Sequence, residues 1–500
     1  MDSQTGSVME GGSAASGKRV EQVDVEAVNR AESRHLYASR KSIQPKLAHG
    51  FYRRLKWTAL ITLLGIYYIL PWVRWDRGPA APDQAVLVDF PHQRFYFFFI
   101  EIWPQEVYYI TGLLILAAVG LFLVTSLFGR VWCGFACPQT IWTDLFIAVE
   151  RLVEGDRNKR MKLERAPWTA GKVGKKAVKH IIWILIAMAT GGAWIFYFHD
   201  APILMRQLFV GEAPLTAYIF MALLTGTTYL FAGFAREQVC TFMCPWPRIQ
   251  AAMIDENSLN VTYRYDRGEP RGPHRRGESW EGRGHCIDCK QCVAVCPMGI
   301  DIRDGAQLEC IQCALCIDAC NGVMAKIDLP KGLIAYDTDD NFAARAAGKK
   351  QTFHLLRPRT IMYAAVMIVV SGIMAFGLTH RTVLELNIQR DRNPLFVTLS
   401  DGDVRNGYTI KILNKKPTAH TFTLETKGVK GASMRVIGFP SGQSSPLITV
   451  KPDTIRALRV FVTRPALEPG VTSLPITFII SDTQDGTRAE TKNVFVGGQP

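Results

Sequence analysis

The chain has 500 residues, 48% of them hydrophobic, and a mean hydropathy of +0.07. It is too apolar for a typical soluble enzyme, and with 20% charged residues it is too polar for a bare membrane bundle. Its 41 Gly and 26 Pro are ordinary contents that exclude collagen and low-complexity disorder, and 12 Cys are too few for a small disulfide scaffold. We therefore expect a membrane protein with additional folded domains.

Five uncharged stretches approach the ~20 apolar residues that cross a bilayer. They are residues 57–73, 107–128, 181–198, 215–234 and 360–378. Residues 1–55 contain no apolar segment typical of a secretory signal, so we expect the first of these stretches to direct membrane insertion.

Lys and Arg residues are distributed unevenly between the connecting segments. Residues 1–56 and 129–178 carry ten each, whereas the loops 76–106 and 199–214 carry two and one. Cytoplasmic loops hold the excess of Lys and Arg, so this bias predicts a cytoplasmic N-terminus and an external C-terminus. The net charge of +14 is then a signal of membrane orientation, and we expect no nucleic-acid partner.

Eight of the cysteines form two copies of C-x2-C-x2-C-x3-C, the spacing with which bacterial ferredoxins bind [4Fe–4S] clusters. In such pairs the fourth cysteine of each motif ligates the other cluster. The predicted ligand sets are Cys286, Cys289, Cys292 and Cys320 for the first cluster, and Cys310, Cys313, Cys316 and Cys296 for the second. Structural zinc, which uses two C-x2-C pairs, has no need of the third and fourth cysteines. Asn321 replaces the Pro usual after the fourth cysteine.

The other four cysteines form two C-x-F-x-C-P motifs, each after an even-numbered spanning stretch: Cys133 and Cys137, then Cys240 and Cys244. The first four helices therefore resemble a duplicated two-helix unit. An i, i+4 spacing predicts both sulfurs of a pair on one helical face, and repeat symmetry would bring the pairs together. Four thiolates suit Cu(I), zinc or a reversible dithiol, and buried cysteines that only fill space are the alternative.

Residues 383–500 alternate short apolar runs with turn residues and contain no cysteine. This rhythm is typical of an immunoglobulin-like β-sandwich. We expect it to serve as a docking or stabilising module.

The order of these features, together with Asp266-Arg-Gly-Glu-Pro-Arg271, closely resembles the CcoG/FixG/RdxA family of cytochrome oxidase accessory proteins over residues 30–500. The resemblance implies an oxidoreductase of the bacterial inner membrane that reduces Cu(II) to Cu(I) during assembly of cbb(3)-type cytochrome c oxidase. Its cofactors would be two [4Fe–4S] clusters and its partners copper, the oxidase assembly factors and an external electron donor. Cys133, Cys137, Cys240 and Cys244 would be the copper or redox thiols.

Five segments are expected: a largely disordered basic tail (1–55), four membrane helices in two repeats (56–235), a cytoplasmic α+β ferredoxin domain (236–359), a fifth membrane helix (360–379) and a periplasmic all-β sandwich (380–500). The helices and C-x3-C-P pairs also resemble quinol dehydrogenase subunits, which lack the sandwich. A quinol dehydrogenase-like electron-transfer subunit and a non-enzymatic copper chaperone or assembly scaffold are therefore the alternative functions.

Overall fold

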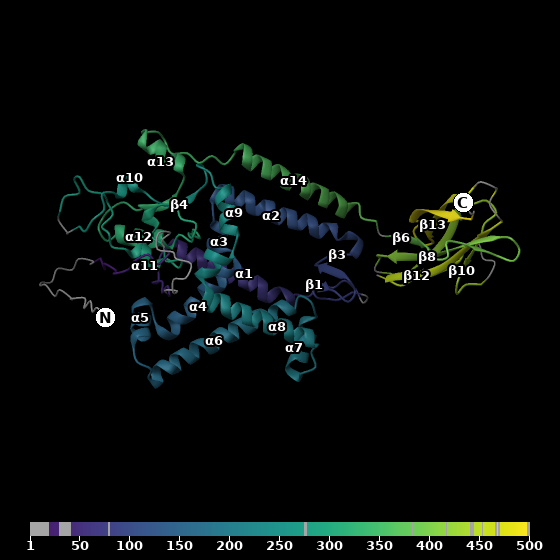
Figure 1. Cartoon of the computed structure of the whole chain (residues 1–500), viewed down its shortest axis with the longest axis horizontal. Coiled ribbons are helices and arrows are strands. Elements are labelled where there is room, and N and C mark those ends of the chain that lie inside the picture. Colours follow the sequence, from purple (N-terminus) through teal and green to yellow (C-terminus); the bar gives the residue numbers. More distant parts are fainter. Residues whose placement is uncertain are drawn as a thin grey trace. The chain divides into compact units, whose positions relative to one another are not determined.

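The computed structural model describes residues 20–29, 42–78, 81–274, 278–382, 384–416, 418–440, 445–452, 454–465, 468 and 471–497. The chain forms two compact units (Figure 1). The first comprises Met1–Val73, Val86–Tyr96 and Glu101–Gly372, and the second Arg74–Ala85, Phe97–Ile100 and Ile373–Pro500.

Among the described residues, five helices are long and apolar enough to cross a membrane, which confirms the five predicted stretches. They are Phe51–Trp72 (α1, Phe51–Ile69, with η2, Leu70–Trp72), Pro104–Phe128 (η3, Pro104–Glu106, with α2, Tyr108–Phe128), Ala170–Ile195 (α6), Leu215–Ala235 (α8, Leu215–Thr228, with η4, Tyr229–Ala235) and Pro358–Thr379 (α14). Helix α6 begins earlier than predicted because the Thr169 hydroxyl accepts a hydrogen bond from the Lys172 N–H (3.3 Å) and caps it.

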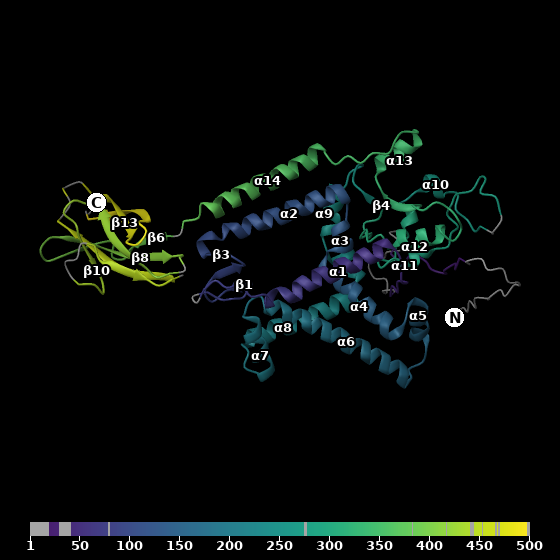
Figure 2. The same cartoon turned by 180° about the vertical axis from the view of Figure 1, so that it is seen from behind.

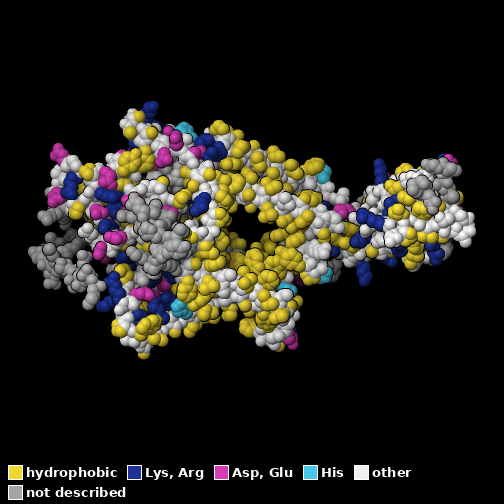
Figure 3. All heavy atoms as spheres, in the orientation of Figure 1, with side chains coloured by type: hydrophobic (Ala, Val, Ile, Leu, Met, Phe, Trp, Pro, Cys, Tyr) yellow, Lys and Arg dark blue, Asp and Glu magenta, His cyan; other side chains and the backbone are white. Residues whose placement is uncertain are grey.

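Shorter elements connect these helices. They are β1 (Val86–Asp89), β2 (Arg94–Phe97), β3 (Ile100–Ile102), α3 (Val131–Phe135), α4 (Pro138–Glu154), α5 (Arg157–Arg165), α7 (Ala201–Val210), η5 (Val239–Met243) and α9 (Trp246–Met253). In Figure 3, hydrophobic side chains gather over the long helices of the first unit, and charged ones gather over the cysteine-rich part that follows α9. This difference is expected where the helices face lipid and the cysteine-rich part faces water.

The cysteine-rich part is a small α+β domain. Strand β4 (Asn260–Tyr263) pairs antiparallel with β5 (Ile334–Asp337), and the other elements are α10 (Tyr265–Gly268), α11 (Gln291–Val295), η6 (Ile302–Asp304), α12 (Leu315–Met324) and α13 (Asp339–Ala346). Its core combines Val261, Ile317 and Leu333 with several of the cysteines. Helices α11 and α12 pack together near the start of α1 (Figure 2).

The prediction of a largely disordered tail is wrong for residues 20–29 and 42–50, which lie against the cysteine-rich domain. The Val28 N–H donates to the Gly299 carbonyl (2.8 Å), and the Lys46 N–H donates to the Ala294 carbonyl (2.8 Å). Val23 and Ile43 are buried because apolar surface of this domain lies beneath them. Residues 1–19 and 30–41 of the predicted tail lie outside the described residues.

The second unit contains the predicted sandwich. One sheet has the order β10-β12-β8-β6, with β7 also paired to β8, and the other has the order β11-β9-β13-β14. The strands are β6 (Leu384–Arg390), β7 (Val397–Thr398), β8 (Val404–Asn414), β9 (His420–Lys427), β10 (Ser433–Val436), β11 (Leu447–Val450), β12 (Thr454–Arg464), β13 (Ser473–Asp482) and β14 (Arg488–Val496). Tyr408, Phe422 and Phe478 are fully buried between the sheets.

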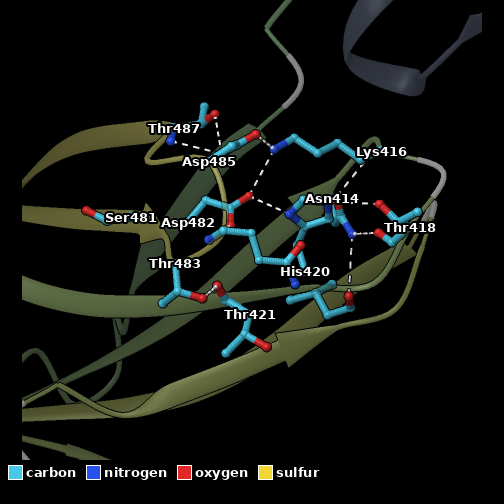
Figure 4. A network of polar contacts seen from close by, with 12 residues as sticks. Asn414, Lys416, Thr418, His420, Thr421, Ser481, Asp482, Thr483, Asp485 and Thr487 are labelled. Carbon is cyan, nitrogen blue, oxygen red and sulfur yellow. Dashed lines mark hydrogen bonds and ion pairs between the residues drawn. The ribbon is translucent and has the colours of Figure 1, made fainter.

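A polar network closes one end of the sandwich (Figure 4). Asp482 lies 2.7 Å from His420 Nδ1 and 2.9 Å from Lys416 Nζ, and the Thr418 hydroxyl lies 2.9 Å from His420 Nε2. The Asn414 side chain donates to the Thr418 and Lys451 carbonyls. These contacts supply partners to polar groups that the β8–β9 turn leaves buried.

Candidate iron–sulfur and thiol sites

The eight ferredoxin-type cysteines line two cavities. One is lined by Cys286, Cys289, Cys292 and Cys320. The other is lined by Cys296, Cys310, Cys313 and Cys316, with Cys292 at its edge. The fourth cysteine of each motif thus lies with the first three of the other motif, in the crossed arrangement that the spacing predicts.

The two cysteine loops share an unusual backbone. Asp288 and Gln312 have φ of 50° and 55°, and Lys290 and Ala314, at the next matching positions, have φ of 54° and 59°. A left-handed backbone conformation is energetically unfavourable for residues other than glycine, and it persists where the surrounding structure imposes it. These turns fold each C-x2-C-x2-C segment around its cavity immediately before α11 or α12 begins.

The cavities fit a sulfur-ligated cofactor by their chemistry. Burial raises the pKa of Cys296 and Cys320 to about 12 and that of Cys310 to about 11, which disfavours the free thiolates. Binding of a metal group would displace these protons. Backbone N–H groups are also directed at the sulfurs, including those of Gln312 toward Cys310 and Ile334 toward Cys320. Hydrogen bonds to the sulfurs are one of the means by which proteins tune iron–sulfur clusters.

Neither C-x3-C-P motif lies on one continuous helical face, so that prediction is wrong. Helix α2 ends before Gly129 (φ 57°), α3 carries Cys133, and Cys137 is the extended residue that precedes α4. In the second copy Arg236 (φ 43°) ends η4, Cys240 lies on η5, and Cys244 follows in an extended conformation. These backbone breaks place each pair on a turn rather than on a straight helix.

The four thiols of the two motifs nevertheless come together. Burial raises the pKa of Cys240 to about 12, and the neighbouring thiols of Cys137, Cys133 and Cys244 act in the same direction. The Cys133 Sγ donates to Gln250 Oε1 at 3.2 Å, which ties α3 to α9. Cys244 is exposed and the other three are partly buried. We call Cys133, Cys137, Cys240 and Cys244 the membrane thiol set.

The membrane thiol set lies against the second cavity. A Cβ built on Gly134 would stand 2.8 Å from the Ile311 carbonyl oxygen and 2.9 Å from that of Gln312. Cys133 and Cys240 pack against the buried group that includes Ile311 and Cys313. Among the described residues, no three His, Cys, Asp or Glu side chains are grouped closely enough to hold a single metal ion.

Two contacts that join the cysteine-rich domain to the membrane helices were not predicted. The Asp318 carboxylate, from within the second cysteine motif, accepts the Arg53 N–H (2.7 Å) and the Tyr52 N–H (3.3 Å) at the start of α1. Arg130 donates its N–H to Gln312 Oε1 (2.7 Å). An acidic residue between two cluster cysteines and an Arg before C-x3-C-P are the sequence signals that could have pointed to them.

Comparisons with known proteins agree with this geometry. Residues 235–339 match the family model of the 4Fe-4S dicluster domain, residues 110–159 that of a 4Fe-4S binding domain, and residues 374–498 that of the IG-like fold at the C-terminal of FixG. The chain is similar to nitrogen fixation protein FixG of Rhizobium meliloti, with 53% identity over 89% of this chain and 91% of the relative.

It is also similar to two proteins of Cereibacter sphaeroides. Protein RdxB is 48% identical over 92% of this chain and 97% of the relative, and protein RdxA is 48% identical over 87% and 91%. The chain therefore belongs to the FixG/RdxA family and is an iron–sulfur electron-transfer protein.

Proposed function

We propose that this protein reduces Cu(II) to Cu(I) at the membrane thiol set during assembly of a cbb(3)-type cytochrome c oxidase. The observation that carries the proposal is the position of Cys133 and Cys240 against the loop that lines the second cavity. Soft thiolate sulfurs prefer Cu(I), so sulfur ligands from the membrane thiol set would favour the reduced ion. Partial burial of Cys133, Cys137 and Cys240 limits their contact with water.

The eight ferredoxin-type cysteines would hold two [4Fe–4S] clusters in the crossed arrangement, with Cys296 and Cys320 exchanged between the motifs. When bound, each cluster supplies one-electron transfer. One electron converts one Cu(II) ion to Cu(I), and an external donor replaces it. Cys244, the exposed member of the thiol set, is positioned to receive the incoming ion.

The N-terminus and residues 236–359 are assigned to the cytoplasm and residues 380–500 to the periplasm of a bacterial inner membrane, on the basis of the Lys and Arg bias. A reporter that requires export should be active when fused after residue 390 and silent after residue 340. The reverse pattern would refute this orientation.

The copper proposal is tested by reoxidation of the reduced protein. Anaerobically reduced protein should reoxidise when Cu(II) is added, and Cys133→Ser and Cys240→Ser should abolish this reaction while the iron content stays unchanged. Thr241→Ser is the matched control and should behave as the unmodified protein, because it alters a neighbouring residue of η5 without removing a sulfur. Reoxidation of a Cys133→Ser, Cys240→Ser double variant at the unmodified rate would exclude the thiol set.

A second candidate function is quinol-linked electron transfer without copper. The 4Fe-4S binding family model over residues 110–159 favours it, because that match includes Cys133 and Cys137. In this case a membrane quinol should reduce the oxidised protein, and Cys133→Ser should lower the iron content per chain. Only the loss of iron separates the two functions, because a membrane quinol can also serve as the external donor for copper reduction.

A further inference from the structure

Arg130 is a buried cation between the membrane thiol set and the second cavity, with 5% of its surface exposed. Its guanidinium donates to three carbonyl oxygens: those of Leu308, Cys310 (3.3 Å) and Pro247 (2.8 Å). Leu308 and Cys310 belong to the cysteine-rich domain, and Pro247 belongs to α9, beside the thiol set. One side chain therefore joins both sites.

Two thiols and one carboxyl group lie near Arg130. Burial lowers its pKa, while the neighbouring Cys310 and Cys133 thiols and the Glu309 carboxyl group act in the opposite direction. The backbone of Arg130 is fixed as well, because Gln312 accepts its N–H and the Gln312 carbonyl in turn accepts the Tyr336 hydroxyl (2.7 Å). The cation is thus held at a defined place beside the second cysteine loop.

The first cavity has a cation of a different kind. Arg303 lies near Cys289 and Cys292, but it forms ion pairs with Asp301 (2.7 Å) and Asp288 (2.5 Å). Two carboxylates offset its charge locally. The guanidinium of Arg130 donates its hydrogen bonds to neutral carbonyl groups and has a single carboxyl group, that of Glu309, as a charged neighbour, so less of its charge is offset than that of Arg303.

We propose that Arg130 is a positioning residue that raises the midpoint potential of the second cluster, bound by Cys296, Cys310, Cys313 and Cys316, above that of the first. Reduction adds one negative charge to a cluster, and a buried cation nearby stabilises that charge in a medium of low dielectric constant. With both clusters bound, electrons from the external donor would then favour the cluster beside the membrane thiol set. This inference rests on the proposed ligand sets and extends the proposed function by giving the electron flow a direction.

Redox titration of the full-length protein, followed by electron paramagnetic resonance without copper, tests the inference. Arg130→Gln should lower the midpoint potential of one cluster and leave the other unchanged, and Arg130→Lys should restore most of the difference. Glu309→Gln removes a negative charge near the same loop and should raise the potential of that same cluster. A purely structural role would not give shifts of opposite sign.

The inference would be overturned if Arg130→Gln shifted neither cluster or both equally, or if Glu309→Gln shifted the same cluster downward. If the Arg130→Gln variant lost its iron, the midpoint potentials of the Arg130→Lys and Glu309→Gln variants would test the inference instead. The titration contains no copper, so its outcome does not depend on copper reduction. Failure of the unmodified protein to reduce Cu(II) would refute the proposed function and leave the measured difference in cluster potentials unaffected.

Discussion

Gly134 sets how closely the membrane thiol set can approach the second cysteine loop. An added Cβ would lie 2.8 to 3.0 Å from the Ile311 and Gln312 carbonyl oxygens and the Cys313 Cα, all backbone atoms that cannot rotate away. Overpacking of this kind costs about 1–3 kcal/mol. We expect Gly134→Ala to lower the thermal midpoint of cluster loss in detergent. Gly192→Ala, where no atom lies within 4 Å of the added Cβ, is the control and should leave the midpoint unchanged or higher.

Asp482 makes the sandwich sensitive to acid. Burial raises the pKa of its carboxyl group, but hydrogen bonds from the Gln484 N–H, Lys416 and His420 outweigh burial and hold the pKa below its usual range. A lowered folded-state pKa contributes stability above the unfolded pKa of about 3.9, and this contribution is lost as pH falls below that value. We expect the calorimetric midpoint of the sandwich to fall between about pH 5 and pH 2.

Asp482→Asn should lower the midpoint at neutral pH and remove most of this acid dependence. Glu425→Gln, on the exposed face of β9, is the matched control and should keep both the midpoint and its pH dependence. An unchanged acid dependence in Asp482→Asn would contradict the assignment to this carboxyl group.

At the scale of elements, Asp318 of α12 acts as the N-terminal cap of α1. Its two hydrogen bonds to the Arg53 and Tyr52 N–H groups place a carboxylate at the positive end of the helix, and Gly50 leaves room for it, since a Cβ there would lie 2.3 Å from the carboxyl carbon. Replacing a cap of this kind costs about 1 kcal/mol. Asp318→Ala should therefore speed hydrogen exchange of the amides at the start of α1.

The control for Asp318→Ala is Glu281→Ala, which alters an exposed acidic residue elsewhere in the cysteine-rich domain. Its exchange at the start of α1 should equal that of the unmodified protein. Equal exchange in the Asp318 variant would show that α1 is held by other contacts, such as the Arg53–Asp144 ion pair (2.9 Å).

The five apolar helices and the sandwich could be predicted from sequence because hydropathy and alternation are local signals. Strand β14 gives a weaker local signal, because Phe495 is its one fully buried residue. The predicted stretches end close to Gly129 and Arg236, but the positive φ at Arg236 could not be predicted because it has no residue signature. The contacts of Arg130 and Asp318 depend on how the cysteine-rich domain docks, which is a tertiary property that no local pattern contains.

For the whole molecule, the division into two units separates the cysteines from the sandwich. All 12 cysteines lie before residue 321, in the first unit, and the sandwich has a core of its own built from its two sheets. A domain with its own core retains its fold independently of residues that do not contribute to that core. Deletion of residues 385–500 should therefore leave the iron content per chain unchanged in membranes that contain the truncated protein.

On the proposed function, the truncated protein would also separate cofactor binding from assembly of the oxidase. If the sandwich is a docking module, the truncation should keep Cu(II)-dependent reoxidation in purified form and lose oxidase maturation in cells. The control is a sandwich variant that leaves the fold intact, Glu425→Gln, which should keep both. Loss of iron from a stably inserted truncation would show that the second unit supports the cysteine-rich domain and would contradict the independence of the two units.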